Sequence, residues 1–349
     1  MDGLDRYDTD RINRINMKRA PAYPVLLALL LTVALAGCRR EPLPEAGNVI
    51  RFSVEAAVAV DVQTKADGDL PDAEEVLKSN PIALYGFCTK SSGTETLFNG
   101  APGTSALTYN TTLGWHYDPL RYWNQGGVYD FRAVSPASSV KTGGSAAITT
   151  GSKVEANYGN YDLMVASNHS TTPLASSSSV APVALAFSHA ASAVRFVFKK
   201  GNDDRTIQIT HLEVNNIYAF GTMTYSWDGQ KDAITSTPDA NSKTDLFGWT
   251  WDGVEDPWEL TDAYQCFDGW HLVVPQTLND QPAAKATVKF SYKIGNGEAQ
   301  SAILSIPDHT WLPGKTYEYQ INLDVLAIGL TFTVKPWPTS VVDGSYTVR

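Results

Sequence analysis

The sequence lacks any long hydrophobic or amphipathic helical segment. Its strongest apolar run, residues 25–36, is shorter than the roughly 20 residues that a helix needs to span a bilayer. No other stretch repeats apolar residues at helical spacing. These absences argue against a protein built mainly from helices.

Basic clusters and cysteines are also scarce. The formal net charge is -10 at pH 7, and no run of lysine or arginine stands out. Such a surface is poorly suited to binding nucleic acid or anionic lipid, so we expect no nucleic-acid partner. Three cysteines are present, and Cys88 and Cys266 lie far apart in the chain. Two buried thiols are at least as well supported as a disulfide between them.

Catalytic motifs are missing as well. The six histidines form no HExxH or His-x-His pattern and have no cysteine at metal-ligand spacing. A nucleophile elbow, a P-loop and a dinucleotide-binding motif are absent. His189, in "AFSHAAS", is expected to lie at a strand end and to hydrogen-bond locally. We therefore expect no metal, no cofactor and no enzymatic activity.

The N-terminal segment has the pattern of an export signal. Lys18 and Arg19 supply positive charge, and "VLLALLLTVALA" supplies the apolar region that follows. The run ends in "LAGC", which looks like a bacterial lipobox, so Cys38 is the expected lipidation site. Residues 1–37 are then the signal peptide, with Met17 as an alternative start. The other interpretation is an ordinary signal peptide followed by a chance cysteine.

Alternation of apolar and polar residues, typical of half-buried strands, recurs along the rest of the chain. It is clearest in "NVIRFSVEAAVAV" (48–60) and returns at 194–198, 288–292 and 317–325. The parity of the apolar positions changes before 328–334, which predicts a turn or bulge at residues 324–327. With 26 glycines and 19 prolines between short strands, the predicted fold is all-β and arranged as sandwiches.

A stretch rich in serine, threonine and alanine, residues 168–182, is the expected linker between two domains. On this division residues 38–65 form a lipidated N-terminal segment. The first domain covers 66–180, and the second covers 181–349.

Three tryptophans gather in the acidic stretch "FGWTWDGVEDPWEL". They are Trp249, Trp251 and Trp258. Exposed aromatic rings between carboxylates could stack on sugar rings or contact a host protein. The alternative, which we weigh more heavily, is that these rings cover the end of a sandwich core.

Five stretches of the sequence carry a family resemblance. They are "RYWNQGGVYDFRAVSP" (121–136), "YDLMVAS" (161–167), "VALAFSHAASAVRFVF" (183–198), "LVVPQTL" (272–278) and "WLPGKTYEYQINL" (311–323). In this order and spacing they resemble the fimbrillin-like family, the lipoprotein pilins of Bacteroidales-type bacteria. The resemblance implies two tandem transthyretin-like β-sandwich domains. It also implies a subunit of a cell-surface fimbria (pilus) that is exported as an outer-membrane lipoprotein and assembled by protease-triggered strand exchange.

The resemblance gives a role to the first strand. A cut between Lys65 and Ala66 would free that strand and open a groove that a strand of another chain can fill. The apolar face of the removable strand comprises Ile50, Phe52, Val54, Val58 and Val60. The donor is expected within residues 328–349, where Ile328, Leu330, Phe332 and Val334 alternate with polar residues.

One departure from the family pattern bears on the cut. Family members commonly carry arginine in a "TRA"-like context, whereas this chain has "TKA". The maturation protease would therefore have to accept lysine, and the alternative is that Lys65 is a solvated loop lysine. A chain that keeps both its strand and its lipid would be the anchor of a pilus, and a cut chain would be a stalk or tip subunit.

The implied partners are other pilin subunits, a lysine- or arginine-specific maturation protease and the outer-membrane lipid through Cys38. A host protein or glycan is a further candidate ligand that would serve adhesion. The alternative function is that of a surface lipoprotein that does not polymerise and binds glycan or host protein through exposed tryptophans.

Overall fold

The computed structural model describes most of the chain after residue 47. The described ranges are 48–56, 72–101, 105–141, 153–159, 161–177, 180–201, 204–218, 220–227, 232–243, 251–252, 257–266, 269–279, 285–324, 328–336 and 346–348, with the backbone alone for residues 227, 242–243, 251–252, 328–336 and 346–348. Several predictions fall outside these ranges: the signal peptide, Cys38, Val58, Val60, Lys65, Ala66 and Trp249. No helix in the described ranges is long and apolar enough to cross a membrane.

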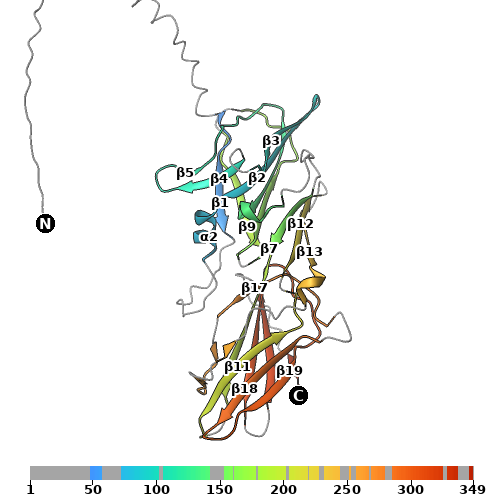
Figure 1. The fold of residues 1–349 in the computed structure, drawn as a ribbon. Helices are drawn as coiled ribbons and strands as arrows, with labels where there is room; N and C mark the ends of the chain where they lie inside the picture. Colours follow the sequence, from blue (N-terminus) through green and yellow to red (C-terminus); the bar gives the residue numbers. More distant parts are fainter. Residues whose placement is uncertain are drawn as a thin grey trace, which may run out of the picture. The chain divides into compact units, whose positions relative to one another are not determined.

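The first sheet has eight strands in the order β1-β9-β8-β6-β2-β4-β5, with β3 also paired to β2; Figure 1 labels six of them, β1, β2, β3, β4, β5 and β9. Their bounds are β1 (Phe52–Ala56), β2 (Ile82–Lys90), β3 (Gly93–Asn99), β4 (Ala106–Asn110), β5 (Gly114–His116), β6 (Val128–Ser135), β8 (Met164–His169) and β9 (Val183–His189). A short helix, α2 (Ala73–Ser79), begins after Asp72, whose side chain accepts hydrogen bonds from two backbone N–H groups of the first turn. A turn of 3-10 helix, η2 (Ala137–Ser139), follows β6.

Strand β2 shows why this sheet has apolar layers on both faces. Its sequence "IALYGFC" does not alternate, and every one of these residues is buried. Ile82 and Leu84 join the core beneath β1, whereas Tyr85 and Phe87 join a second core on the other face. A strand covered on both faces needs apolar side chains at successive positions.

The second face of the first sheet is covered by a three-stranded sheet in the order β13-β12-β7. These strands are β7 (Val154–Tyr158), β12 (Gly221–Trp227) and β13 (Asp232–Pro238). β7 pairs with β12 in the antiparallel sense, with Tyr158 opposite Gly221. The hairpin β12–β13, which was expected to belong to the second domain, therefore completes the core of the first sheet.

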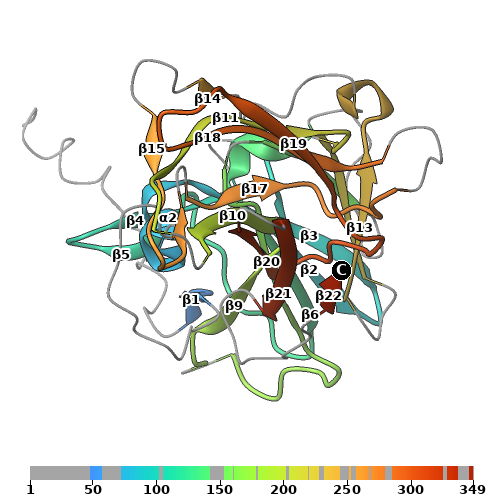
Figure 2. The same ribbon diagram turned by 90° about the horizontal axis from the view of Figure 1, so that it is seen from below.

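The second sandwich has two further sheets, seen as two layers in Figure 2. One contains β10 (Ser192–Lys200), β16 (Gln265–Cys266), β17 (His271–Val273), β20 (Lys315–Leu323), β21 (Ile328–Pro336) and β22 (Tyr346–Val348); the other contains β11 (Ile207–Asn215), β14 (Trp251–Asp252), β15 (Trp258–Glu259), β18 (Thr287–Ile294) and β19 (Gln300–Ser305). A further 3-10 turn, η3, spans Ala240–Lys243. Phe198, Phe290 and the fully buried Trp311 belong to the shared core. The all-β sandwich fold predicted from the sequence is confirmed.

The predicted strands lie where alternation placed them. Residues 194–198 lie in β10, 288–292 in β18 and 317–323 in β20. The change of parity before residue 328 marks an antiparallel hairpin, because Leu323 lies opposite Ile328 and the nine-residue register runs on from there. The expected turn is thus the reversal between β20 and β21.

The transition between the sheets differs from the expected linker and domain boundary. Residues 170–182 join β8 to β9, and these two strands pair with each other in the first sheet. The chain enters the second sandwich later, through Ala190 and Ala191, directly between β9 and β10. A Ser/Thr-rich loop within one sheet has the same composition as a linker, so composition could not separate the two.

Candidate functional site

Strand β1 forms one edge of the first sheet and is the last described strand before the predicted cut. It pairs with β9 in the parallel sense, with Phe52 opposite Val183 and Ala56 opposite Phe187. β1 is the terminal strand of the pairing order, so its other edge has no strand partner among the described residues. A parallel partner that lies far away in sequence cannot be deduced from local alternation.

The residues just before β1 pair with a different segment, residues 121–123, and this short antiparallel pairing is called the seam below. Val49 and Tyr122 form an antiparallel bridge. The Ile50 N–H donates to the Arg121 carbonyl at 2.9 Å, and the Trp123 N–H donates to the Asn48 carbonyl at 2.8 Å. The chain then changes partner, since the Val183 N–H donates to the Arg51 carbonyl at 2.7 Å. Residues 48–56 are therefore held by backbone hydrogen bonds from two separate segments.

An aromatic cage seats the side chain of Phe52. Its ring makes edge-to-face contacts with Phe98, Tyr117 and Phe131 at centroid distances of 5.7, 5.8 and 5.5 Å. Such pairs are worth about 0.5–1.5 kcal/mol beyond the burial of area. The Tyr117 hydroxyl also donates to the Ile50 carbonyl at 2.6 Å. Burial raises the pKa of Tyr117 to about 12, so the hydroxyl keeps its proton at neutral pH.

Burial along the segment follows the predicted face and decreases toward the cut. Ile50 is 0% exposed and Phe52 is 7% exposed. Val54 and Ala56 are only half-buried, against the core that also receives Val76 of α2. Arg51 and Glu55, on the alternate face, are exposed. On the predicted apolar face Ile50 and Phe52 are buried and Val54 is half-buried, whereas Val58 and Val60 lie outside the described residues.

The predicted donor segment forms an edge hairpin of the second sandwich. Strand β21 pairs with β20 over nine positions, from Lys315 opposite Pro336 to Leu323 opposite Ile328. The register places Leu330 opposite Ile321, Phe332 opposite Tyr319 and Val334 opposite Tyr317. β22 then pairs with β21 through residues 346–348. The structure thus places the predicted donor residues and the predicted removable strand in different sheets.

The predicted tryptophan cluster is only partly described. Trp258 lies in β15, is half-buried and packs edge-to-face on Phe198 of the second core, at a centroid distance of 5.7 Å. The backbone of Trp251 pairs with Leu212 of β11. The position of Trp258 agrees with the alternative in which these rings cover the end of a core.

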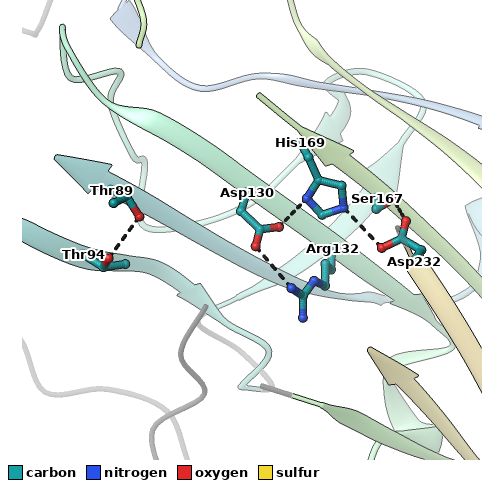
Figure 3. Close-up of polar contacts among 7 residues, drawn as sticks. All are labelled: Thr89, Thr94, Asp130, Arg132, Ser167, His169 and Asp232. Atoms are coloured by element: carbon teal, nitrogen blue, oxygen red, sulfur yellow. Dashed lines mark hydrogen bonds and ion pairs between the residues drawn. The ribbon is translucent and has the colours of Figure 1, made fainter. Parts of the chain in front are cut away.

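A partly buried polar network in the first sandwich was not predicted from the sequence (Figure 3). Asp130 of β6 contacts Arg132 of the same strand, Nη2 to Oδ2 at 3.2 Å, and His169 of β8, Nδ1 to Oδ1 at 2.6 Å. The other nitrogen of His169, Nε2, contacts Oδ1 of Asp232 of β13 at 3.2 Å. Ser167 donates to the remaining oxygen of Asp232. The network therefore connects the first sheet to the hairpin that covers it.

The electrostatics of this network favour a charged histidine. Burial lowers the pKa of His169, but hydrogen bonds to Asp130 and Asp232 outweigh it and raise the pKa to about 8. Burial likewise raises the pKa of Asp232, but His169 and Ser167 hold it below its ordinary value. Asp232 lies between Ser167 and His169, so the histidine is not placed to take the serine proton as in a nucleophilic triad. The sequence held one indication of this network, because its polar residues occupy inward positions of the apolar strands β6 and β8.

The remaining candidate residues have structural surroundings. His189 lies at the end of β9, as predicted, but its contact at 2.8 Å is with Asp162, a buried side chain from a distant part of the chain, so the predicted local hydrogen bond is not found. Neither Cys88 nor Cys266 takes part in a disulfide within the described part of the chain. The described residues contain no cluster of histidine, cysteine and acidic side chains that could hold a metal ion.

The fold and its edge strand define a class of protein: an all-β chain of sandwiches whose first described strand closes a sheet edge. The chain belongs to the fimbrillin-like family, whose model matches residues 64–337. No curated protein matches the sequence. Membership of this family supports a fimbrial subunit that interacts with other fimbrial subunits at the cell surface.

One solved structure agrees with the fold. A fimbrial protein from Bacteroides vulgatus is similar with a TM-score of 0.56 at 14% identity, over 83% of this chain and 99% of that chain. A putative cell adhesion protein from Bacteroides ovatus is similar with a TM-score of 0.44 at 13% identity, over 85% of this chain and 98% of that chain. At such identity the first of these likenesses speaks for the fold alone.

Proposed function

We propose that this chain is a fimbrial subunit that is exported as a lipoprotein through Cys38, cut between Lys65 and Ala66 and assembled by strand exchange. The observation that carries the proposal is the position of β1 at a sheet edge, with its apolar face in a core and the predicted cut shortly after it. The family match runs from residue 64 to residue 337, so it covers most of the part of the chain that would remain after the cut.

The acceptor site in this proposal is the place that residues 48–56 occupy. Their removal would leave β9 without its parallel partner and would open the cage that holds Phe52. Unpaired backbone groups at a sheet edge together with empty apolar pockets favour pairing with another strand. Backbone hydrogen bonds would give affinity, and the pockets at alternate positions would give specificity.

The donor in this proposal is the C-terminal segment, residues 328–349, of a second copy or of another subunit. Its strand β21 pairs with β20, and the short β22 is the last strand of that sheet. An edge hairpin can leave its sheet without disturbing the strands on the far side of β20. The alternation Ile328, Leu330, Phe332 and Val334 suits pockets spaced two residues apart.

The role is structural and adhesive rather than catalytic in this proposal. The partners are other pilin subunits, a lysine- or arginine-specific maturation protease and outer-membrane lipid, and the location is the cell-surface fimbrium. Recognition of glycan through Trp249, Trp251 and Trp258 remains the alternative. The contact of Trp258 with the core residue Phe198 favours the structural role for that ring.

The test is the state of the protein recovered from the cell surface. We expect a chain that begins at Ala66, by intact mass and N-terminal sequencing, and a heat-labile ladder of oligomers on gels without boiling. The variant Lys65→Ala should retain acylated Cys38 and run as a single band, whereas the control Lys90→Ala should behave like the wild type. A wild-type chain that keeps acylated Cys38 and stays monomeric would contradict polymerisation by strand exchange.

A further inference from the structure

The contacts that seat residues 48–56 do not depend on the peptide that would be cut. The partners of this segment are β9, the residues 121–123 and the rings of Phe98, Tyr117 and Phe131. All of them belong to the body of the protein after residue 72. A cut between Lys65 and Ala66 would leave every one of these contacts in place.

We infer that the first strand stays seated after the cut, held by Tyr117 and the aromatic cage, until an incoming strand of a second copy displaces it from the Ala56 end. This inference rests on the proposed function and adds its regulation. Cutting a tether removes the high effective concentration that favours rebinding, but it leaves the contacts that slow departure. The cut would therefore make loss of the strand irreversible without making it fast.

The two ends of residues 48–56 are bound with unequal strength, and this difference sets the direction of displacement. The end at residues 48–52 combines the antiparallel seam with the buried side chains of Ile50 and Phe52. The other end has parallel pairing with β9 and the half-buried Val54 and Ala56. Edge residues with less buried surface open first. An incoming strand can therefore pair first beside Ala186 and Phe187, while the opposite end is still occupied.

Tyr117 helps to hold the more strongly bound end, residues 48–52, and is called the latch below. Its hydroxyl donates to the Ile50 carbonyl, and its ring contacts both Phe52 and Phe98. The Arg121 N–H donates to the same hydroxyl oxygen at 3.3 Å, which ties the latch to the segment that forms the seam. Loss of the hydroxyl alone would remove this hydrogen bond and leave the ring packing intact.

The experiment uses the full chain with a recognition sequence for a site-specific protease placed within residues 57–71. After complete cleavage, native mass spectrometry and gel filtration should find the N-terminal fragment still bound to the body. The substitution Tyr117→Phe should speed its loss about three- to tenfold, as expected for one buried hydrogen bond. The control Tyr292→Phe removes an exposed hydroxyl bond to Gln300 in the other sandwich and should leave the rate unchanged.

Two synthetic peptides test the direction. A peptide of residues 52–60 should speed loss of the fragment, because it can pair at the loose end first. A peptide of residues 44–52 should have little effect. A fragment that separates from the body as soon as it is cut overturns the seated strand, and equal or reversed peptide effects overturn the direction. Because the cut is engineered, retention is measured even in a chain that never forms a ladder, so the two proposals can fail separately.

Discussion

The strand predicted to be removed, β1, and the strand that carries the predicted donor face, β21, are held in different ways. β1 has five residue pairs with β9, and its position is fixed by buried side chains in a cage. β21 has nine residue pairs with β20, so a long backbone ladder holds it. A backbone ladder can form with any open strand edge, whereas a cage accepts only side chains of suitable shape. The comparison teaches that selectivity in strand exchange would lie in the acceptor rather than in the donor.

The largest expected effect is removal of the cage's central ring. Phe52→Ala should lower the free energy of unfolding by about 3–5 kcal/mol, because a buried phenyl ring is lost and a cavity is left among three aromatic rings. Urea unfolding followed by aromatic fluorescence measures it. The control Phe220→Ala removes a ring that is 51% exposed and should change stability little. Equal effects in the two variants would mean that side-chain pockets do not hold β1.

The second effect concerns the network that fastens the covering hairpin to the first sheet. The pKa of His169 is raised above 6.5 to about 8, so its stabilising contribution is complete below about pH 6.5 and is lost as pH rises through about 8. The full contribution is about 2 kcal/mol, since one pKa unit corresponds to about 1.4 kcal/mol.

Unfolding free energies measured between pH 6 and pH 9 test this dependence. The substitution His169→Gln should remove the decrease in stability over that range, whereas the control His116→Gln should keep it. A decrease that persists in His169→Gln would assign the pH dependence to another group.

The third effect addresses the backbone ladder. Thr331 of β21 lies opposite Gln320 of β20 on one side and Thr347 of β22 on the other. The substitution Thr331→Pro removes its backbone N–H. The loss should cost at least about 1 kcal/mol and should weaken protection of the β20 amides in hydrogen exchange. The hydrogen-exchange protection of residues 50–52 should not change. A simultaneous loss of protection there would show that β1 and β21 are coupled.

The smallest effect concerns the ion pair between Arg195 and Glu318, on neighbouring strands β10 and β20. Both side chains are partly exposed, so Glu318→Gln should cost less than about 1 kcal/mol, measured by thermal unfolding. A larger loss would mean that side-chain contacts, and not the ladder alone, hold the sheet that contains β21.

Local patterns in the sequence predicted the elements well but not their partners. The alternation at residues 50–56 gave the face of β1 that is buried, and the change of parity before residue 328 located a hairpin. The parallel pairing of β1 with β9 joins segments more than a hundred residues apart, which no local pattern encodes. The hairpin β12–β13 falls within the predicted second domain but packs against the first sheet, and no local pattern encodes that contact either.

Polar residues within apolar strands carried information that alternation alone did not use. Asp130 and Arg132 lie at inward positions of β6, where solvent cannot satisfy them. Such residues need partners, and their presence implies a second polar element on the same face. Which element supplies it, here Asp232, depends on long-range packing.

The two-residue passage from β9 to β10 through Ala190 and Ala191 has a mechanical consequence. In the proposed fimbria, tension would enter at the strand beside β9 and leave through the sheet of β10 and β20. The load would therefore run along one covalent line, from β9 directly into β10. Both strands have parallel neighbours, and parallel strands pulled along their length share the force among all their hydrogen bonds at once instead of opening one pair at a time.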